Sequence, residues 1–176
     1  FSCYYGTIVS SEQGGTVENV KVVNNIAHDI TRAGFSIPWW SGTLDGLKRN
    51  IQFINNTSCN NGHGFWIQSP SNENVIFENN ILSQNEVSIE IVPEAVAQTT
   101  VDHNLFDGAG DAMGTNPVVG DPLFVDPDGA DFHLQSGSPA IDAGSPLNAP
   151  ADDYDGNPRP QGSEYDMGAF EYIGGS

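Results

Sequence analysis

The sequence predicts an all-β fold, a parallel β-solenoid, from three observations. A strand-like segment that ends in paired asparagines recurs along the chain. Its residues alternate between apolar and polar with period two, as in a strand. The shortest repeat is too short for a strand–helix–strand unit. A solenoid is built from such repeats because one coil cannot bury its own apolar side, whereas stacked coils share a core.

The recurring segment gives the repeat length. The second asparagine of each pair falls at Asn25, Asn56 and Asn80, and Asn104 stands in a fainter fourth copy. The copies are 31, 24 and 24 residues apart. Because a strand–helix–strand unit needs about 30 residues or more, a step of 24 favours one three-strand coil. Asparagine suits the corners of a coil because it tolerates left-handed backbone angles.

Each coil is expected to contain two strands that the sequence locates. One strand lies within each of the ranges 19–26, 50–57 and 74–81. A second strand follows each asparagine pair after nine or ten residues. In this second set the residues expected to face the core are Phe35, Ile37, Phe65, Ile67, Ile89 and Ile91. Ser36, Trp66 and Glu90 lie between them and should face outward, because side chains alternate along a strand.

The composition agrees with a narrow core shared between coils. Apolar residues make up 38% of the chain and charged residues only 16%, and much of the remainder is asparagine, serine and glycine. The formal net charge of −18 argues against binding to nucleic acid or to an anionic membrane, since both require basic surfaces. The sequence contains no run of about 18 apolar residues, so no membrane span is expected.

The tail of the sequence resembles a known superfamily. It contains DPLFVD at 121–126, DFHL at 131–134, GSPAIDAG at 137–144, DYDGNPRP at 153–160 and DMGAFEY at 166–172. With the asparagine repeats, these segments resemble the C-terminal part of secreted bacterial proteins of the right-handed parallel β-helix (pectate-lyase-like) superfamily. The resemblance covers nearly the whole chain. It implies a right-handed parallel β-helix, secreted or at the bacterial cell surface.

The superfamily contains lyases, hydrolases, epimerases and non-enzymatic adhesins, so the fold does not choose among them. The resemblance implies a carbohydrate-active protein that acts on a polysaccharide, as a glycoside hydrolase or as a polysaccharide lyase. The alternative is a non-catalytic glycan-binding or adhesin module. A structural subunit that completes the helix of another chain is a third interpretation.

The chain is expected to divide into β-helix coils at 1–109 and a last coil with a C-terminal capping region at 110–176. The sequence opens directly into a strand without an N-terminal cap, which predicts a processed or truncated piece of a longer chain. A bare coil exposes strand edges and core. The first coil, near 1–18, should therefore be covered by a second polypeptide or by a missing N-terminal segment.

The two cysteines are expected to remain unpaired. If Gly6, Gly34 and Gly64 mark equivalent corners, Cys3 lies two coils from Cys59. Neighbouring coils are spaced by about 4.8 Å, which separates the two Cα atoms by roughly 10 Å. A disulfide needs a Cα separation below about 7 Å.

The outward face of the second strand set is the expected substrate surface, because the superfamily carries its substrate groove there. Trp66 and Gln68 lie on this face. An indole ring is a plate on which a sugar ring can stack, and the alternative is that a loop or another chain covers Trp66. The 31-residue step contains a loop with Trp39 and Trp40, of which one should be exposed and one packed.

The candidate catalytic residues depend on the reaction. Glycoside hydrolysis needs two carboxyl groups, for which Glu90 is the best placed and Asp45 is its candidate partner. A lyase needs a base to remove a proton beside a uronate and a cation to neutralise the carboxylate. His63 and Arg32, at the corner before the outward strand, are the candidates for these roles. Each of these residues also suits an ordinary surface position.

Calcium is the one cofactor that the sequence suggests. An acidic chain repels a polyuronate unless a cation bridges the two. The candidate ligands are Asp152, Asp153 and Asp155, directly before Gly156. This run lacks the twelve-residue loop and terminal Glu of an EF-hand. The alternative role for these aspartates is turn formation.

Overall fold

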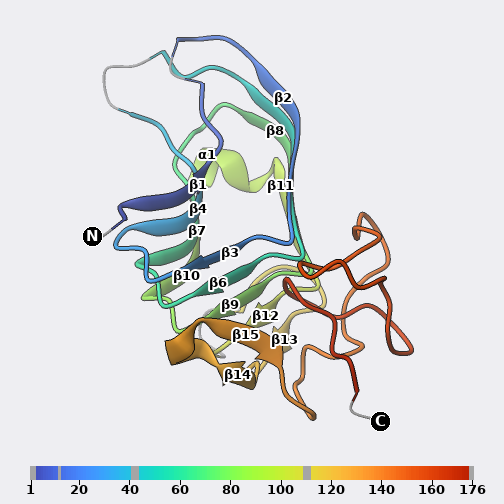
Figure 1. Cartoon of the computed structure of the whole chain (residues 1–176). Coiled ribbons are helices and arrows are strands. Elements are labelled where there is room, and N and C mark those ends of the chain that lie inside the picture. Colours follow the sequence, from blue (N-terminus) through green and yellow to red (C-terminus); the bar gives the residue numbers. More distant parts are fainter. Residues whose placement is uncertain (1–2, 12, 41–43, 109–111, 175–176) are drawn as a thin grey trace.

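The computed structural model of the chain describes residues 3–11, 13–40, 44–108 and 112–174. Parallel β-strands in stacked sheets dominate this part of the chain, which contains few helical residues (Figure 1). The all-β prediction is confirmed, and the arrangement is compatible with a β-solenoid. No helix among the described residues is long and apolar enough to cross a membrane.

The strands form three parallel sheets, and consecutive strands along the chain belong to the first, second and third sheet in turn. The first sheet contains β1 (Tyr5–Ile8), β4 (Ala33–Ile37), β7 (His63–Ile67) and β10 (Val87–Ile91). The second contains β2 (Val17–Val23), β5 (Lys48–Ile54), β8 (Asn72–Glu78) and β11 (Thr99–Asp102). The third contains β3 (Ile26–His28), β6 (Thr57–Cys59), β9 (Ile81–Ser83), β12 (Leu105–Phe106) and β13 (Val118–Val119). We call three consecutive strands, one from each sheet, a coil.

The register places equivalent residues of the repeat side by side. Val20 lies beside Ile51, which lies beside Val75 in the second sheet, and Phe35 lies beside Phe65 in the first. The residues expected to face the core in β4 and β7 expose 1% of their surface or less, namely Phe35, Ile37, Phe65 and Ile67. Ile89 and Ile91 of β10 are half-buried. The predicted strand positions and inward faces are therefore confirmed.

Stacked aromatic rings fill the interior between the sheets. Phe35 stacks on Phe65 at 4.9 Å between ring centroids, and Phe53 stacks on Phe77 at 4.8 Å. The two stacks meet edge to face, since Phe53 and Phe65 lie 5.6 Å apart at 82°. Each ring repeats the position of the ring in the neighbouring coil, so coil stacking itself buries the apolar area that stabilises the fold.

Asparagines turn the chain between the second and third sheets. Asn24, Asn55 and Asn79 have φ angles of 54°, 53° and 58°. This left-handed conformation strains most residues, and asparagine adopts it at lower cost because its side chain hydrogen-bonds locally. The predicted corner role of the asparagine pairs is confirmed.

Glycines form a second column, in the first sheet. The register of β1, β4 and β7 brackets Gly6, Gly34 and Gly64 at equivalent positions, as predicted. A Cβ atom on Gly6 would lie only 2.4 Å from the carbonyl oxygen of Gly34, so a larger residue would push the strands apart. Both cysteines are free, with Cys3 exposed and Cys59 buried.

The C-terminal region begins with a short antiparallel hairpin. It consists of β14 (Phe124–Asp126) and β15 (Asp131–Leu134), joined by the 3₁₀ turn η1 (Pro127–Gly129). The hairpin lies beside the third sheet (Figure 1), where Phe132 contacts the ring of His28 at 5.2 Å. Phe132 is buried and belongs to an apolar cluster with Cys59 of β6 and Ile81 of β9.

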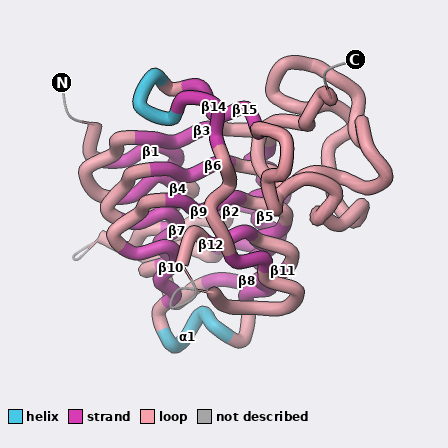
Figure 2. Tube along the Cα trace, turned by 90° about the horizontal axis from the view of Figure 1, so that it is seen from below, coloured by secondary structure: helices cyan, strands magenta, loops and turns pink. Residues whose placement is uncertain are grey.

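The loops after the hairpin run along the side of the coils. The corner asparagines of three coils donate to backbone carbonyls in these loops: Asn24 to Asp152, Asn55 to Asp166 and Asn79 to Ser145. Figure 2 shows these loops beside the sheets, while α1 (Pro93–Val96) lies at the end near β10 and β11. These contacts are lateral, so they give no support to the expectation that 110–176 caps the end of the coils.

A buried ion pair holds the C-terminal loops together. The Nη1 atom of Arg159 donates to Oε1 of Glu171 at 2.6 Å, and neither side chain is exposed. Asp166 accepts backbone N–H groups from Asp142 at 2.7 Å and Tyr172 at 2.6 Å. Burial raises the pKa of Asp166 to about 6. These acidic residues are structural.

Candidate active site

The first sheet presents one row of side chains on its outward face. Ile8, Ser36, Trp66 and Glu90 are aligned across its four strands. Ser36 is buried despite this position, Trp66 is half-buried and Glu90 is exposed. The chemically distinctive part of the row therefore lies over β7 and β10.

His63 connects Trp66 to Glu90. Its Nε2 atom lies 2.8 Å from Oε2 of Glu90. Its ring stacks on the indole of Trp66, with centroids 4.3 Å apart and planes 8° apart. Because an ionised carboxylate only accepts hydrogen bonds, Glu90 favours the tautomer in which Nε2 carries the proton and Nδ1 remains basic.

Arg32 brings a cation to the same group. Its guanidinium carbon lies 5.0 Å from the centroid of the Trp66 ring and 5.5 Å from that of Tyr5. Both distances suit a cation–π contact. Arg32 precedes β4, and its backbone carbonyl accepts from the N–H of His63, so the main chain fixes their spacing.

Most other cations of this acidic chain are already neutralised. The chain has five Lys and Arg residues in all. Lys48 pairs with Asp45, Arg49 lies between Glu18 and Glu73, and Arg159 pairs with Glu171. Within the described residues, Arg32 and Lys21 make no ion pair with a carboxylate. Arg32 is thus a positive charge held by aromatic rings at the outward face.

A groove of about 610 Å³ opens beside this cluster. The residues that line it are Trp39, Trp66, Gln68, Pro70, Glu90, Val92 and Glu94. Trp39 is 49% exposed, whereas Trp40 is half-buried and packs edge to face on Tyr5 at 5.5 Å. The prediction that one loop tryptophan is exposed and the other packed is confirmed. The groove has the size and the aromatic wall of a small-ligand site.

Asp45 belongs to a buried network next to the groove. One of its carboxylate oxygens accepts from Nζ of Lys48, and the other accepts from Oγ of Ser69 at 2.8 Å. Burial alone would raise the pKa of Asp45, but the hydrogen bonds from Lys48 and Ser69 outweigh it and lower that pKa. The network ties the Trp39 loop to the turn after β7. Its partners are therefore Lys48 and Ser69, and the partner of Glu90 is His63.

Two residues of this site are absent from the sequence predictions. Glu94 lies in α1 and adds a second carboxylate to the groove. The pair Pro93–Glu94 directly after a strand is a helix-start pattern that could have located it. Tyr5 supports Arg32 and Trp40, and burial raises its pKa. The sequence signal for its position is the glycine repeat, since Tyr5 precedes Gly6 as His63 precedes Gly64.

One of the aspartates considered for calcium, Asp153, forms a turn in the structure, and Asp155 contacts His133 at 2.9 Å. The carboxylate of Asp153 accepts backbone N–H groups from Asp155 at 2.9 Å, Asn157 at 2.8 Å and Glu171 at 3.0 Å. A carboxylate surrounded by N–H donors does not fit a cation. No group of three His, Cys, Asp or Glu residues within the described ranges has the arrangement of a metal site.

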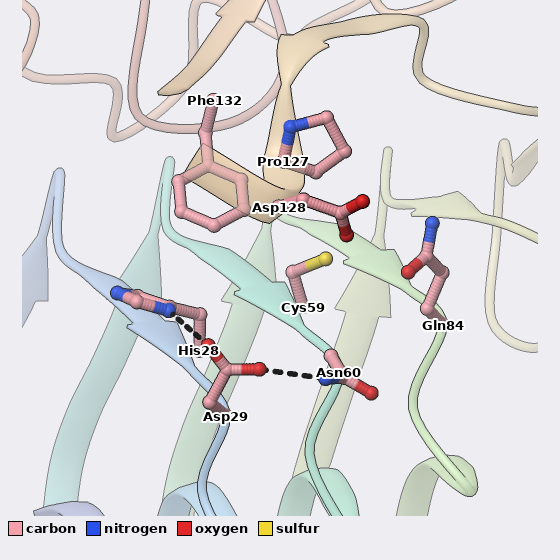
Figure 3. Close-up of a pocket in the computed structure, with 8 residues that line it drawn as sticks. All are labelled: His28, Asp29, Cys59, Asn60, Gln84, Pro127, Asp128 and Phe132. Atoms are coloured by element: carbon pink, nitrogen blue, oxygen red, sulfur yellow. Dashed lines mark hydrogen bonds and ion pairs between the residues drawn. The ribbon is translucent and has the colours of Figure 1, made fainter. Parts of the chain in front are cut away.

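A second, smaller cavity lies on the third sheet. Figure 3 shows Asp29 between His28 and Asn60, with Cys59 beneath the η1 turn. Asp29 contacts His28 at 2.8 Å and Asn60 at 2.6 Å. Burial raises the pKa of the Cys59 thiol to about 11, which keeps it protonated and unreactive at neutral pH. The cavity of about 90 Å³ has room for about three water molecules, which is too little for a sugar ring.

Comparison with known proteins adds no assignment. No protein-family model matches the sequence, and no curated protein matches it. Function is therefore argued from the outward face of the first sheet.

Proposed function

We propose that this chain is part of a secreted right-handed parallel β-helix protein of the pectate-lyase-like superfamily and that it cleaves a polysaccharide. One observation carries the proposal. His63, Glu90, Arg32 and Trp66 converge on one patch of the outward face, beside a groove with an exposed tryptophan. A flat aromatic strip without converging titratable groups would instead favour a binding module.

The group suits β-elimination at a uronate residue. The Nδ1 atom of His63 takes the proton from the carbon beside the sugar carboxylate, and Glu90 stabilises the resulting imidazolium. The electron pair forms a carbon–carbon double bond as the C–O bond to the leaving sugar breaks. The leaving oxygen takes a proton from the imidazolium or from water. Arg32 stabilises the negative charge that develops on the sugar carboxylate.

The groove supplies binding rather than chemistry. Trp39 offers an exposed indole, while one face of Trp66 is occupied by His63. Trp39 is therefore the better platform for a sugar ring, and Gln68 offers an amide for hydroxyl groups. These residues set the affinity for the polymer, whereas His63 sets the rate.

Hydrolysis is the second candidate, because two carboxyl groups, Glu90 and Glu94, line the groove. In that reaction one acts as the acid and the other as the base or nucleophile. The hydrogen bond between His63 and Glu90 favours elimination, since it gives Glu90 a partner that a hydrolase acid does not need. A non-catalytic glycan-binding module remains the alternative from another class.

The test is a screen of polyuronates and neutral glycans with two readouts. Ultraviolet absorbance detects the unsaturated product of elimination, and a reducing-end assay detects any cleavage. We expect both to rise on a polyuronate and His63→Gln to abolish both. His28→Gln is the matched control, because His28 also pairs with a carboxylate, Asp29, but on the third sheet.

The outcomes separate the three functions. New reducing ends without ultraviolet absorbance would show that the reaction is hydrolysis and not elimination. Binding to a polymer without release of any product would show that the chain is a binding module and not an enzyme. Equal activity of the His63→Gln variant and the wild type would show that His63 is not the base.

A further inference from the structure

Positive charge is scarce at the outward face of the first sheet. The other Lys and Arg residues of the chain are held elsewhere, two of them in buried ion pairs and two on the second sheet, namely Lys48 and Arg159, and Lys21 and Arg49. Within the described residues, Arg32 is therefore the one Lys or Arg side chain that can meet a sugar carboxylate beside His63.

The contacts of Arg32 fix the place of this single charge. Its guanidinium carbon lies 5.0 Å from the ring centroid of Trp66, and its backbone carbonyl accepts from the N–H of His63 at 2.6 Å. A uronate whose carboxylate meets Arg32 therefore lies next to the imidazole. The described part of the chain offers no second cation there for the carboxylate of a neighbouring sugar.

The groove next to this cluster carries negative charge. Its described lining includes two exposed glutamates, Glu90 and Glu94, but no Lys, Arg or His. In the proposed reaction His63 is a neutral base before proton transfer, so Glu90 keeps its charge. Glu94 adds a second charge from the first turn of α1, which follows β10 (Figure 2). A uronate in the groove would bring its carboxylate beside both glutamates, and like charges repel.

The remaining walls of the groove suit an uncharged sugar. Trp39 exposes an indole ring, against which the apolar face of a sugar ring can pack. Pro70 and Val92 extend this apolar surface. Gln68 offers an amide, which pairs with a hydroxyl or an acetamido group and carries no charge of its own. The groove can therefore bind a sugar ring, but it offers nothing that would neutralise a carboxylate.

A hollow on the other side of Arg32 is acidic as well. It has a volume of about 310 Å³, and the residues that precede Arg32 and His63 in the chain help to line it. Asp29 and Glu86 belong to its described lining, which again includes no Lys, Arg or His. Carboxylates therefore flank Arg32 on both sides along the strands.

We propose that the substrate is a mixed polysaccharide, in which a uronate alternates with a sugar that carries no negative charge, and not a homopolymer of uronates. This inference rests on the proposed function. The uronate carboxylate meets Arg32, while the neighbouring sugar lies in the groove, with its ring on Trp39 and its hydroxyl or acetamido groups at Gln68. Glu94 repels a second uronate from the groove and is thus a specificity-determining residue.

Two pairs of polymers test the preference. Hyaluronan, in which glucuronate alternates with N-acetylglucosamine, is compared with polyglucuronate. The rhamnogalacturonan backbone, in which galacturonate alternates with rhamnose, is compared with polygalacturonate. Tryptophan fluorescence measures binding to the His63→Gln chain, so that cleavage does not interfere, and ultraviolet absorbance measures cleavage by the wild type. In the pair whose uronate the site accepts, the mixed polymer should bind at least about tenfold more tightly.

Variants of Glu94 test the cause of the preference. In the His63→Gln chain, Glu94→Gln should improve binding of the homopolymer severalfold and leave binding of the mixed polymer nearly unchanged. Glu94→Lys should improve binding of the homopolymer further, because it places a cation in the groove. Glu164→Gln is the matched control, because it changes the net charge by the same amount at an exposed position in the C-terminal loops. The control should leave the ratio of the two affinities as it is.

The outcomes distinguish this inference from the proposed function. Equal or tighter binding of the homopolymer would overturn the inference, even if the wild type releases an ultraviolet-absorbing product. An unchanged ratio in both Glu94 variants, or no binding to any of these polymers, would also overturn it. A preference for the mixed polymer without such a product would support the inference and contradict elimination.

Discussion

The imidazole of His63 lies parallel to the indole of Trp66, with centroids 4.3 Å apart, while its Nε2 atom contacts Glu90 at 2.8 Å. The stacking fixes the plane of the imidazole, and the carboxylate fixes which nitrogen carries the proton. A surface histidine with neither contact would rotate freely. The two contacts therefore hold the imidazole in one orientation next to the groove, as the proposed proton transfer requires.

Glu90→Gln tests this preorganisation. The amide keeps the shape of the side chain but no longer stabilises a charged imidazolium, so kcat on a polyuronate should fall by about 10² to 10⁴, the range of general acid–base catalysis. The measurement is initial rate by ultraviolet absorbance. Glu73→Gln is the control, because Glu73 is also exposed and ion-paired but lies on the second sheet. A fall of equal size in both variants would contradict a specific role.

Trp39→Ala tests the binding wall. Loss of an aromatic platform worth about 1 kcal/mol should raise KM roughly fivefold and leave kcat nearly unchanged. Steady-state kinetics give both constants. Tyr154→Ala is the control, because Tyr154 is another exposed aromatic residue, in the C-terminal loops. A fall in kcat without a change in KM would place Trp39 in the chemistry instead.

The net charge of −18 predicts an effect of salt on polyuronate binding. Raising the ionic strength from about 0.01 M to about 0.15 M shortens the Debye length from about 30 Å to about 8 Å. The long-range repulsion should weaken more than the short-range attraction to Arg32, so KM should fall severalfold. A neutral glycan should show no such change. A rise in KM with salt would mean that local attraction dominates the encounter.

Asn80→Ala tests the column of stacked asparagines formed by Asn25, Asn56, Asn80 and Asn104, which are hydrogen-bonded from coil to coil. The substitution removes the acceptor of the buried Asn56 N–H and the side-chain donor to the carbonyl of Phe53, which should lower the free energy of unfolding by about 2–3 kcal/mol. Chemical denaturation measures it. Asn25→Ala at the exposed end of the same column should cost less than about 1 kcal/mol. Equal losses would mean that burial does not set the strength of the column.

His133 makes the C-terminal region sensitive to pH. It lies between Asp131 at 2.6 Å and Asp155 at 2.9 Å. Burial would lower its pKa, but the hydrogen bonds that its ring donates to the two aspartates outweigh burial and raise that pKa above 6.5. The folded state therefore binds a proton more tightly than the unfolded chain. The resulting stabilisation is complete below pH 6.5 and is lost as the pH rises through the raised pKa.

The comparison of wild type with His133→Gln measures this effect. The difference in Tm should be larger at about pH 5.5 than at about pH 8.5. His28→Gln, which removes a histidine on the third sheet, is the control for a general effect of the substitution. A difference in Tm that grows with pH would reverse the sign of the proposed linkage.

The repeat made much of the fold predictable. A 24-residue step between Asn56 and Asn80 is too short for a strand–helix–strand unit and suits one three-strand coil, and the alternation of Phe65 and Ile67 assigns the inward face. The same alternation placed Trp66 and Glu90 on one outward row, which the register confirms. The lateral course of the C-terminal loops could not be predicted in this way, because their contacts with Asn24, Asn55 and Asn79 join residues more than 60 positions apart.

By itself the sequence determined which residues are corners, which face the core and which share the outward face, because these follow from period and residue type. Only the tertiary structure decided the pairing of side chains. The sequence suggested Asp45 as the carboxyl partner of Glu90, yet Glu90 contacts His63 while Lys48 and Ser69 bind the two oxygens of Asp45. The reason is physical: pairing depends on how coils stack and on how a loop folds over them, and neither is a local property of the chain.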